Sequence, residues 1–180
     1  MISIKTAKLE DVEMISLIFA ACWKKAYKRI LPRKYLKKLQ DNFMNESLVK
    51  LIEDENSGFK VICNDDKIIG AAAFGKSTDK YHRTYGEIYY IYIHPKYKRK
   101  GFGSFLFNAI VNDVRNCGYK MCHLWVFRDN KKARKFYEKM NFECSDSIRY
   151  FEVDEAKDVF PEIRYEKSLE ISKEKDDDTN

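Results

Sequence analysis

Glycine, proline and long apolar runs are scarce in this sequence of 180 residues. With 7 Gly and 3 Pro, the chain cannot be collagen-like, elastic or dominated by linkers. Its longest apolar runs, such as residues 68–74, are far shorter than the roughly 18 residues that a membrane-spanning helix needs. The start, Met1-Ile2-Ser3-Ile4-Lys5, lacks the basic-then-apolar order of a secretory signal. We therefore expect a cytoplasmic protein without a membrane partner.

Cysteine and histidine are too scattered to form a cross-linked or metal-binding framework. The 5 cysteines are an odd number and include no Cys-x-x-Cys pair, and the 3 histidines show no metal-ligand spacing. We expect reduced thiols, as in a cytosol, and no metal site.

Aromatic and basic side chains are plentiful. Apolar residues make up 44% and aromatic residues 14% of the chain, which is enough for one domain with a real core. The 34 Lys and Arg against 28 Asp and Glu give a net charge of +6, which permits an anionic partner without demanding one. Residues 170–180 contain no aromatic residue and carry the acidic run Asp176-Asp177-Asp178 near their end, so we expect a folded domain at 1–169 and a disordered charged tail at 170–180.

Apolar spacing predicts helices and strands in alternation. Residues 9–28 carry a helical stripe formed by Val12, Ile15, Ile18, Phe19, Cys22 and Ala26. Further helices are expected near 34–40, 46–54, 104–117 and 130–140, the last with Asp129 as its N-cap. Strands are expected at 2–6, 59–63, 67–74, 87–94, 121–127, 145–153 and 162–169, and the apolar run 87–94 predicts burial on both of its faces. This order predicts an α/β (α+β) fold, a mixed sheet with helices on its faces.

The strand at 87–94 runs into a basic turn with two glycines, Gly101 and Gly103, and the turn opens a helix. Free backbone N–H groups and the positive end of the helix dipole point at such a turn, and glycine lets a ligand approach the backbone closely. The turn therefore predicts a cradle for a pyrophosphate, although glycines here could also serve only the turn. No Gly-Lys-Ser/Thr follows and a third glycine is absent, so neither a Walker loop nor a dinucleotide fingerprint is present.

Two motifs resemble one family. Lys98-Arg99-Lys100-Gly101-Phe102-Gly103 resembles motif A, Arg/Gln-x-x-Gly-x-Gly/Ala, of the GNAT superfamily of acyl-CoA-dependent N-acetyltransferases, with Lys98 in place of Arg or Gln. The segment from Asn130 to Phe142 resembles the family's Asn-x-x-Ala-x-x-Phe-Tyr-x-x-x-Gly-Phe, with Asn141 replacing a glycine. Asn is the next-best residue for a left-handed helix end. The resemblance covers about residues 1–169 and implies a single domain with a mixed, mostly antiparallel sheet, splayed central parallel strands at 87–94 and 121–127, and helices on both faces.

The resemblance implies acetyl-CoA as cofactor, bound where the two central strands splay. Its pantetheine arm would pair with the strand backbone and with an Asn side chain, and its pyrophosphate would lie on the basic turn. The cofactor-binding residues that the resemblance assigns are Ile91, Tyr92, Ile93, Lys98, Arg99, Lys100, Gly101, Phe102, Gly103, Ser104, Asn130 and Tyr137. Tyr137 would also protonate the departing thiolate, and the alternative is that it only packs on its helix face. No metal is required, and family members usually transfer the acetyl group directly in a ternary complex.

An amine must be neutral to attack a thioester, and most amines are protonated at pH 7. Glu87 is the candidate base, because it lies on a strand that resembles the one on which the histone-acetyltransferase branch carries its glutamate. Burial should raise its pKa. The alternatives are a solvent-facing Glu87, a Glu87 paired with Lys or Arg, and a water chain as base. Arg128 stands where some members carry another Glu.

The acceptor is the open question: a small amine, an amino acid or antibiotic, or a protein N-terminus or lysine. Trp23 and Tyr27 share a helix face and could form an aromatic wall for the acceptor, or could cap the core. Tyr81, His82 and Tyr85 precede the central strand and could line the same opening. Residues 24–38 contain eight basic residues and no acidic ones, which is typical of a solvated face. If this run flanks the acceptor groove, it predicts poor activity on polyamines.

Two other functions compete with an acetyltransferase. One is a non-catalytic acyl-CoA sensor, against which the presence of Glu87 and Tyr137 argues. The other is a basic nucleic-acid-binding module, which is disfavoured because its aromatic residues would have to be exposed, whereas the tyrosine-rich run predicts a buried strand. Homo-oligomerisation stays open.

Overall fold

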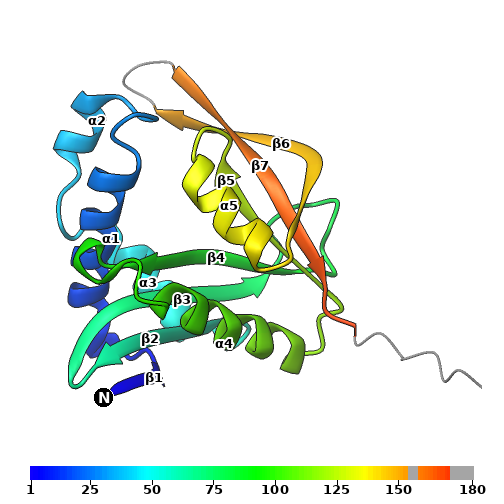
Figure 1. The fold of residues 1–180 in the computed structure, drawn as a ribbon, viewed down its shortest axis with the longest axis horizontal. Helices are drawn as coiled ribbons and strands as arrows, with labels where there is room; N and C mark the ends of the chain where they lie inside the picture. Colours follow the sequence, from blue (N-terminus) through cyan, green and yellow to red (C-terminus); the bar gives the residue numbers. More distant parts are fainter. Residues whose placement is uncertain (154–157, 171–180) are drawn as a thin grey trace, which may run out of the picture.

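The computed structural model of the protein describes residues 1–153 and 158–170, so most of the expected tail at 170–180 lies outside the described residues. One twisted sheet separates two groups of helices (Figure 1). The strands are β1 (Ile2–Thr6), β2 (Gly58–Asn64), β3 (Lys67–Lys76), β4 (Gly86–Ile93), β5 (Met121–Phe127), β6 (Glu143–Val153) and β7 (Asp158–Ser168). The helices are α1 (Val12–Ala26), α2 (Arg33–Lys38), α3 (Asn45–Glu53), α4 (Phe102–Asn116) and α5 (Lys131–Lys139), with short 3-10 turns η1 (Leu9–Asp11) and η2 (Pro95–Tyr97).

The sheet is mixed, and its one parallel pair lies in the middle. The strand order is β1-β2-β3-β4-β5-β7-β6, and every neighbouring pair is antiparallel except β4 and β5. The parallel pair is joined only from Gly86↔Cys122 to Ile88↔Leu124, after which the two strands diverge. The expected single domain with splayed central strands is therefore confirmed.

Each face of the sheet is covered by apolar helix faces. On one face, Phe107 and Ile110 of α4 pack against Ile88 and Ile93 of β4. On the other face, Phe19 of α1 belongs to a second apolar cluster, which lies between the sheet and the helices α1 and α3. A third cluster, formed by Tyr27, Leu31, Leu36, Phe127 and Val153, joins the α1–α2 region to the ends of β5 and β6. Among the described helices, none is both long and apolar enough to cross a bilayer.

A bulge in β4 decides which of its side chains share a face. The register with β3 pairs Tyr90 with Ala73 but Ile88 with Phe74, so Tyr89 is the extra residue of β4. Ile88 packs on the α4 face, whereas Tyr90 packs on the α1 face. Because successive side chains of a strand point to opposite faces of the sheet, Glu87 lies on the face opposite to that of Ile88, which is the α1 face with Tyr90. No local sequence signal predicted this bulge.

Burial of β4 on both faces was predicted for its whole length, and this prediction is wrong for its middle. Gly86, Glu87, Ile88 and Ile93 are buried, but residues 89–92 are half-buried. The reason is the splay, because β5 leaves β4 after Ile88 and no longer covers its edge.

Several element ends also differ from expectation. The first turn of the helix expected at 9–28 is a 3-10 turn, η1, and α1 itself ends at Ala26. The N-cap of α5 is Asn130 rather than Asp129, since the Asn130 side chain accepts a hydrogen bond from the Ala133 N–H at 3.3 Å. The expected left-handed Asn141 is confirmed, with a φ of 60°.

Candidate active site

The turn before α4 leaves backbone N–H groups open at the helix start. The first helical bond runs from the Phe105 N–H to the Gly101 carbonyl at 3.1 Å, so the N–H groups of Phe102, Gly103 and Ser104 precede it. Arg99 and Gly101 are both left-handed, with φ of 66° and 83°. Left-handed residues interspersed in a turn direct successive N–H groups into a concave, anion-binding arrangement.

The space around this turn suits a phosphate ligand. Among the described residues, a Cβ placed on Gly101 would meet no atom within 4 Å, and the nearest neighbours of one on Gly103 would be Ile93 and Phe136, each at an ordinary contact distance of 3.8 Å. Around these two glycines, side chains of the described residues therefore leave the approach to the backbone open. Lys98 and Lys100 are exposed beside it and add positive charge. The turn thus fits the pyrophosphate that its sequence predicted.

Beyond the splay, the backbone of β4 faces the diverging β5. The His94 N–H donates to the Ile69 carbonyl at 2.8 Å, and antiparallel alternation then turns the N–H and C=O groups of Ile91 and Ile93 away from β3. The same alternation turns the Tyr92 backbone toward β3, so Ile91 and Ile93 are the better candidates for pairing with a ligand. The Cys22 thiol donates to the Ile93 carbonyl at 3.2 Å.

Three phenols approach the splay from both faces of the sheet. From the α1 side, the Tyr27 and Tyr92 hydroxyls lie 3.2 Å apart, and Trp23 Nε1 donates to the Tyr92 hydroxyl at 3.0 Å. From the α5 side, Tyr137 packs against Phe107, with ring centroids 5.7 Å apart. Burial, and then the nearby Tyr27 phenol, raise the pKa of Tyr137 well above its usual range. Tyr137 is therefore a protonated phenol at neutral pH.

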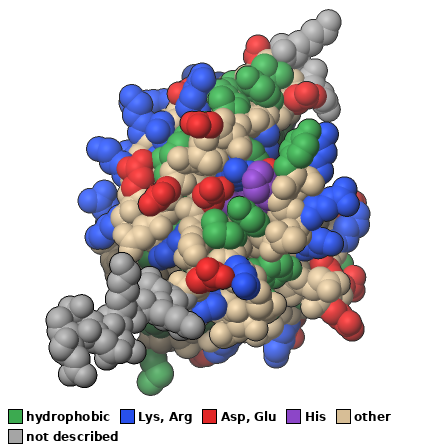
Figure 2. Space-filling model, turned by 90° about the vertical axis from the view of Figure 1, so that its right-hand side faces the viewer, with side chains coloured by type: hydrophobic (Ala, Val, Ile, Leu, Met, Phe, Trp, Pro, Cys, Tyr) green, Lys and Arg blue, Asp and Glu red, His purple; other side chains and the backbone are tan. Residues whose placement is uncertain are grey.

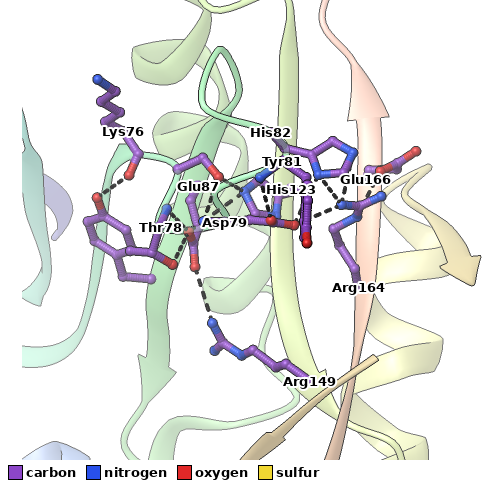
Figure 3. A network of polar contacts seen from close by, with 12 residues as sticks. Lys76, Thr78, Asp79, Tyr81, His82, Glu87, His123, Arg149, Arg164 and Glu166 are labelled. Atoms are coloured by element: carbon purple, nitrogen blue, oxygen red, sulfur yellow. Dashed lines mark hydrogen bonds and ion pairs between the residues drawn. The ribbon is translucent and has the colours of Figure 1, made fainter. Parts of the chain in front are cut away.

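Glu87 lies at the start of β4, in the short stretch that pairs with β5, and is buried, with 3% of its surface exposed. Its Oε2 accepts hydrogen bonds from the Thr78 N–H at 2.6 Å and the Thr78 hydroxyl at 2.7 Å, and Arg149 Nη1 lies 3.7 Å from its Oε1 (Figure 3). Burial raises the pKa of Glu87, against the opposing effect of Thr78 and Arg149. The expected upward shift of the pKa is confirmed, and the solvent-facing alternative is wrong, whereas the expected alternative of a Glu87 paired with an arginine is borne out by Arg149.

His123 lies beside Glu87 on the neighbouring strand and is fully buried. Its Nε2 lies 2.8 Å from the Ser77 hydroxyl and 3.7 Å from Glu87 Oε2. Burial lowers the pKa of His123 to about 4, so the imidazole is neutral at pH 7. It therefore adds no charge next to Glu87.

A buried ion-pair cluster fixes the loop that carries Thr78. Arg164 of β7 pairs with Asp79 Oδ2 at 3.1 Å and with Glu166 at 3.0 Å (Figure 3). Because Asp79 is the neighbour of Thr78, this cluster anchors the two donors that hold Glu87.

The four aromatic residues expected to line an acceptor opening fall into two separate groups. Trp23 and Tyr27 lie against Tyr92 and Phe127, and Tyr27 is buried in the core as the alternative expectation had it. Tyr85 packs against His123, at the opposite end of β4, and Tyr81 is 79% exposed there. Figure 2 shows that end of the molecule, where acidic and basic side chains are interspersed. The expectation of one aromatic wall is therefore wrong.

Three residues near Glu87 were not found from the sequence: Thr78, His123 and Arg149. Thr78 and Arg149 come from a loop and a distant strand and carry no local signal. His123 could have been found, because alternation along β5 puts it on the same face as Phe127, away from α4.

This geometry is that of an acyl-CoA-dependent transferase, with a phosphate turn, an open strand edge, a buried carboxylate and a protonated phenol along two splayed strands. Residues 15–142 match the sequence profile of the acetyltransferase (GNAT) family. The chain belongs to that family and is an acyltransferase of the N-acetyltransferase type.

Individual relatives agree with this assignment. An uncharacterized N-acetyltransferase, YuaI of Bacillus subtilis, is 27% identical over 72% of this chain and 74% of its own length. The spermidine N(1)-acetyltransferase of Thermoplasma acidophilum is 24% identical over 92% of this chain and 98% of its own length. The crystal structure of PaiA N-acetyltransferase from Thermoplasma acidophilum in complex with coenzyme A has the same fold, with a TM-score of 0.75 and 22% identity, over 93% of this chain and 99% of that one.

Proposed function

We propose that this protein transfers the acetyl group of acetyl-CoA directly to a primary amine in a ternary complex, with Glu87 as base and Tyr137 as acid. The observation that carries the proposal is the order of three features along the single strand β4. Its first residues hold the buried Glu87, its middle has an unpaired edge, and its end leads to the open N–H groups of α4.

Acetyl-CoA supplies the activated acetyl group as a thioester. The residues proposed to hold it are the backbone of Ile91 and Ile93, the turn from Lys98 to Ser104 and the Asn130 amide. Because Asn130 Oδ1 already caps α5, its NH₂ group is the part offered to the pantetheine arm.

The proposed proton path starts at the acceptor ammonium group. Since Glu87 is only 3% exposed, we assign the transfer from the amine to Oε1 through one intervening water. The raised pKa of Glu87 lies closer to neutral pH than that of an ordinary glutamate, which makes this carboxylate a stronger base. The Tyr137 hydroxyl, kept protonated by its raised pKa, donates its proton toward the leaving sulfur.

The test is a panel of primary amines, read out as release of free CoA, followed by the rate–pH profile on the best acceptor. Glu87→Gln should lower kcat/KM by about 100-fold or more and remove the acidic limb that belongs to Glu87. Thr78→Val removes a hydrogen bond to the ionised carboxylate, so it should raise the pKa of Glu87 and move the acidic limb to higher pH. Thr78→Ser keeps the hydroxyl and should leave the limb in place.

A Glu87→Gln profile that matches the parent would assign the base elsewhere. Absence of CoA release with every amine, together with no heat on titration with acetyl-CoA, would contradict acetyl transfer itself.

A further inference from the structure

Arg149 of β6 is held rigidly beside Glu87. Its Nε donates to Glu162 Oε2 at 2.7 Å, and its guanidinium lies over the Trp125 ring, 4.8 Å from the ring centroid. Its Nη1 lies 3.7 Å from Glu87 Oε1 (Figure 3). Stacking and the bond to Glu162 fix the plane of the guanidinium, so its direction toward Glu87 is built in.

This guanidinium still has donors to offer. The Nε–H is used by Glu162, whereas Nη1 is too far from Glu87 for a hydrogen bond, and no hydrogen bond joins Nη1 or Nη2 to any described residue. The Arg149 side chain is 44% exposed, against 4% for Glu87. A molecule that approaches Glu87 from solvent therefore meets the Nη edge of Arg149, the edge that binds carboxylates in a bidentate way.

The charges around Glu87 determine which amines can approach it. Glu87 attracts an ammonium group and the adjacent Arg149 repels it, although the Glu162 carboxylate bonded to Arg149 Nε offsets part of that repulsion. Arg164 is paired with Asp79 at 3.1 Å and with Glu166 at 3.0 Å, so its charge is offset within its own cluster. An acceptor that carries only positive charge is therefore attracted by Glu87 and repelled by Arg149. A carboxylate next to the amine turns the repulsion from Arg149 into an attraction.

The separation of the two groups also limits where that carboxylate can be. Arg149 Nη1 and Glu87 Oε1 are 3.7 Å apart, so an acceptor whose carboxylate binds Arg149 while its amine reaches Glu87 through one water is best served by an amine and a carboxylate that lie close together. In an α-amino acid these groups are two bonds apart, but in an ω-amino acid or at a peptide N-terminus they are distant.

We propose that Arg149 determines acceptor specificity, and that the preferred acceptor is a free α-amino acid whose carboxylate binds the Arg149 guanidinium while its α-amino group faces Glu87. This inference rests on the proposed amine acetylation and narrows its acceptor. It also predicts a low activity on polyamines, but attributes that low activity to Arg149 alone rather than to the basic run at 24–38.

The experiment compares free α-amino acids with their carboxamides, which keep the amine and side chain but lack the negative charge. Spermidine and 6-aminohexanoate serve as acceptors with no carboxylate near the amine. CoA release is measured with the full chain at saturating acetyl-CoA, at a pH above the acidic limb of Glu87. The free acids should have a kcat/KM about 10- to 100-fold above their amides, as expected for a charge-assisted hydrogen bond.

Arg149→Met keeps an unbranched side chain over Trp125 but has no charge, so the acid-to-amide ratio should fall to near one, mainly through a higher KM for the acids. Arg149→Lys keeps the charge without the planar fork and should give an intermediate ratio; it also replaces Arg149→Met if that variant does not fold. Unfolding temperature and acetyl-CoA affinity are measured for both variants.

Equal or greater kcat/KM on the amides, on spermidine or on 6-aminohexanoate in the parent enzyme would overturn the inference and leave amine acetylation standing. An acid preference that survives in Arg149→Met would overturn it as well. Absence of CoA release with every acceptor would instead contradict the proposed function, and the inference with it.

Discussion

Burial raises the pKa of both Glu87 and Tyr137, and the two shifts suit opposite tasks. For the carboxylate, the shift strengthens a base that would otherwise be weak at neutral pH. For the phenol, the shift keeps the proton in place until a basic thiolate forms nearby. The same physical cause therefore prepares one residue to accept a proton and the other to donate one, without a charged partner at hydrogen-bond distance from either side chain within the described residues.

The Tyr137 hydroxyl can be removed without disturbing its packing. Tyr137→Phe keeps the ring against Phe107 and Phe136, so the fold and acetyl-CoA affinity should change little. The loss of the proton donor should lower kcat by about 100-fold. Steady-state kinetics give kcat, and calorimetry gives the affinity. An unchanged kcat would leave Tyr137 as a packing residue only.

The two glycines of the α4 turn differ in what they do for this element. Gly101 has a φ of 83°, which a residue with a Cβ adopts only at a cost, whereas Gly103 lies inside the helix, where a Cβ would make ordinary contacts at 3.8 Å. Gly101 thus serves the backbone conformation of the turn. Gly103 leaves space beside it, and the family motif accepts alanine there.

Alanine at each position should therefore have opposite effects on stability. Gly101→Ala should lower the free energy of unfolding by about 1–2 kcal/mol, the cost of a left-handed residue, and weaken acetyl-CoA binding by deforming the turn. Gly103→Ala should raise the free energy of unfolding by up to about 0.5–1 kcal/mol, because glycine is a poor helix residue. Urea unfolding measures both. Equal changes in the two variants would contradict the assigned roles.

Local elements were predictable from the sequence, and the residues around Glu87 were not. The α4 turn, the cap at Asn141 and the splayed strands follow from signals that lie within a few residues or from the family resemblance. The bulge at Tyr89 depends on the register with β3, and the contacts of Thr78 and Arg149 with Glu87 depend on how distant segments meet. Sequence periodicity contains no information on such long-range contacts. The expected aromatic wall was wrong for the same reason, because α1 and the loop before β4 carry their aromatic residues to opposite ends of β4.

At the scale of the whole molecule, positive charge is concentrated in separate basic runs, and the residues around these runs differ. The eight basic residues of 24–38 are all exposed, while Tyr27, Leu31 and Leu36 between them are buried. This alternation is that of an amphipathic surface segment, and Lys24 pairs there with Asp41 at 3.0 Å. The basic residues at 96–100, in contrast, flank the open N–H groups of α4.

Two double variants with the same change in net charge separate a local from a global effect of this charge. Lys98→Gln with Lys100→Gln removes charge at the turn and should weaken acetyl-CoA binding by about fivefold, the sum of two exposed ion pairs. It should also flatten the decline of affinity with added salt, since fewer screened contacts remain. Lys34→Gln with Lys37→Gln on α2 should leave affinity and salt dependence unchanged in calorimetry. Equal weakening in both variants would show that the field of the whole molecule, rather than the turn, attracts the cofactor phosphates.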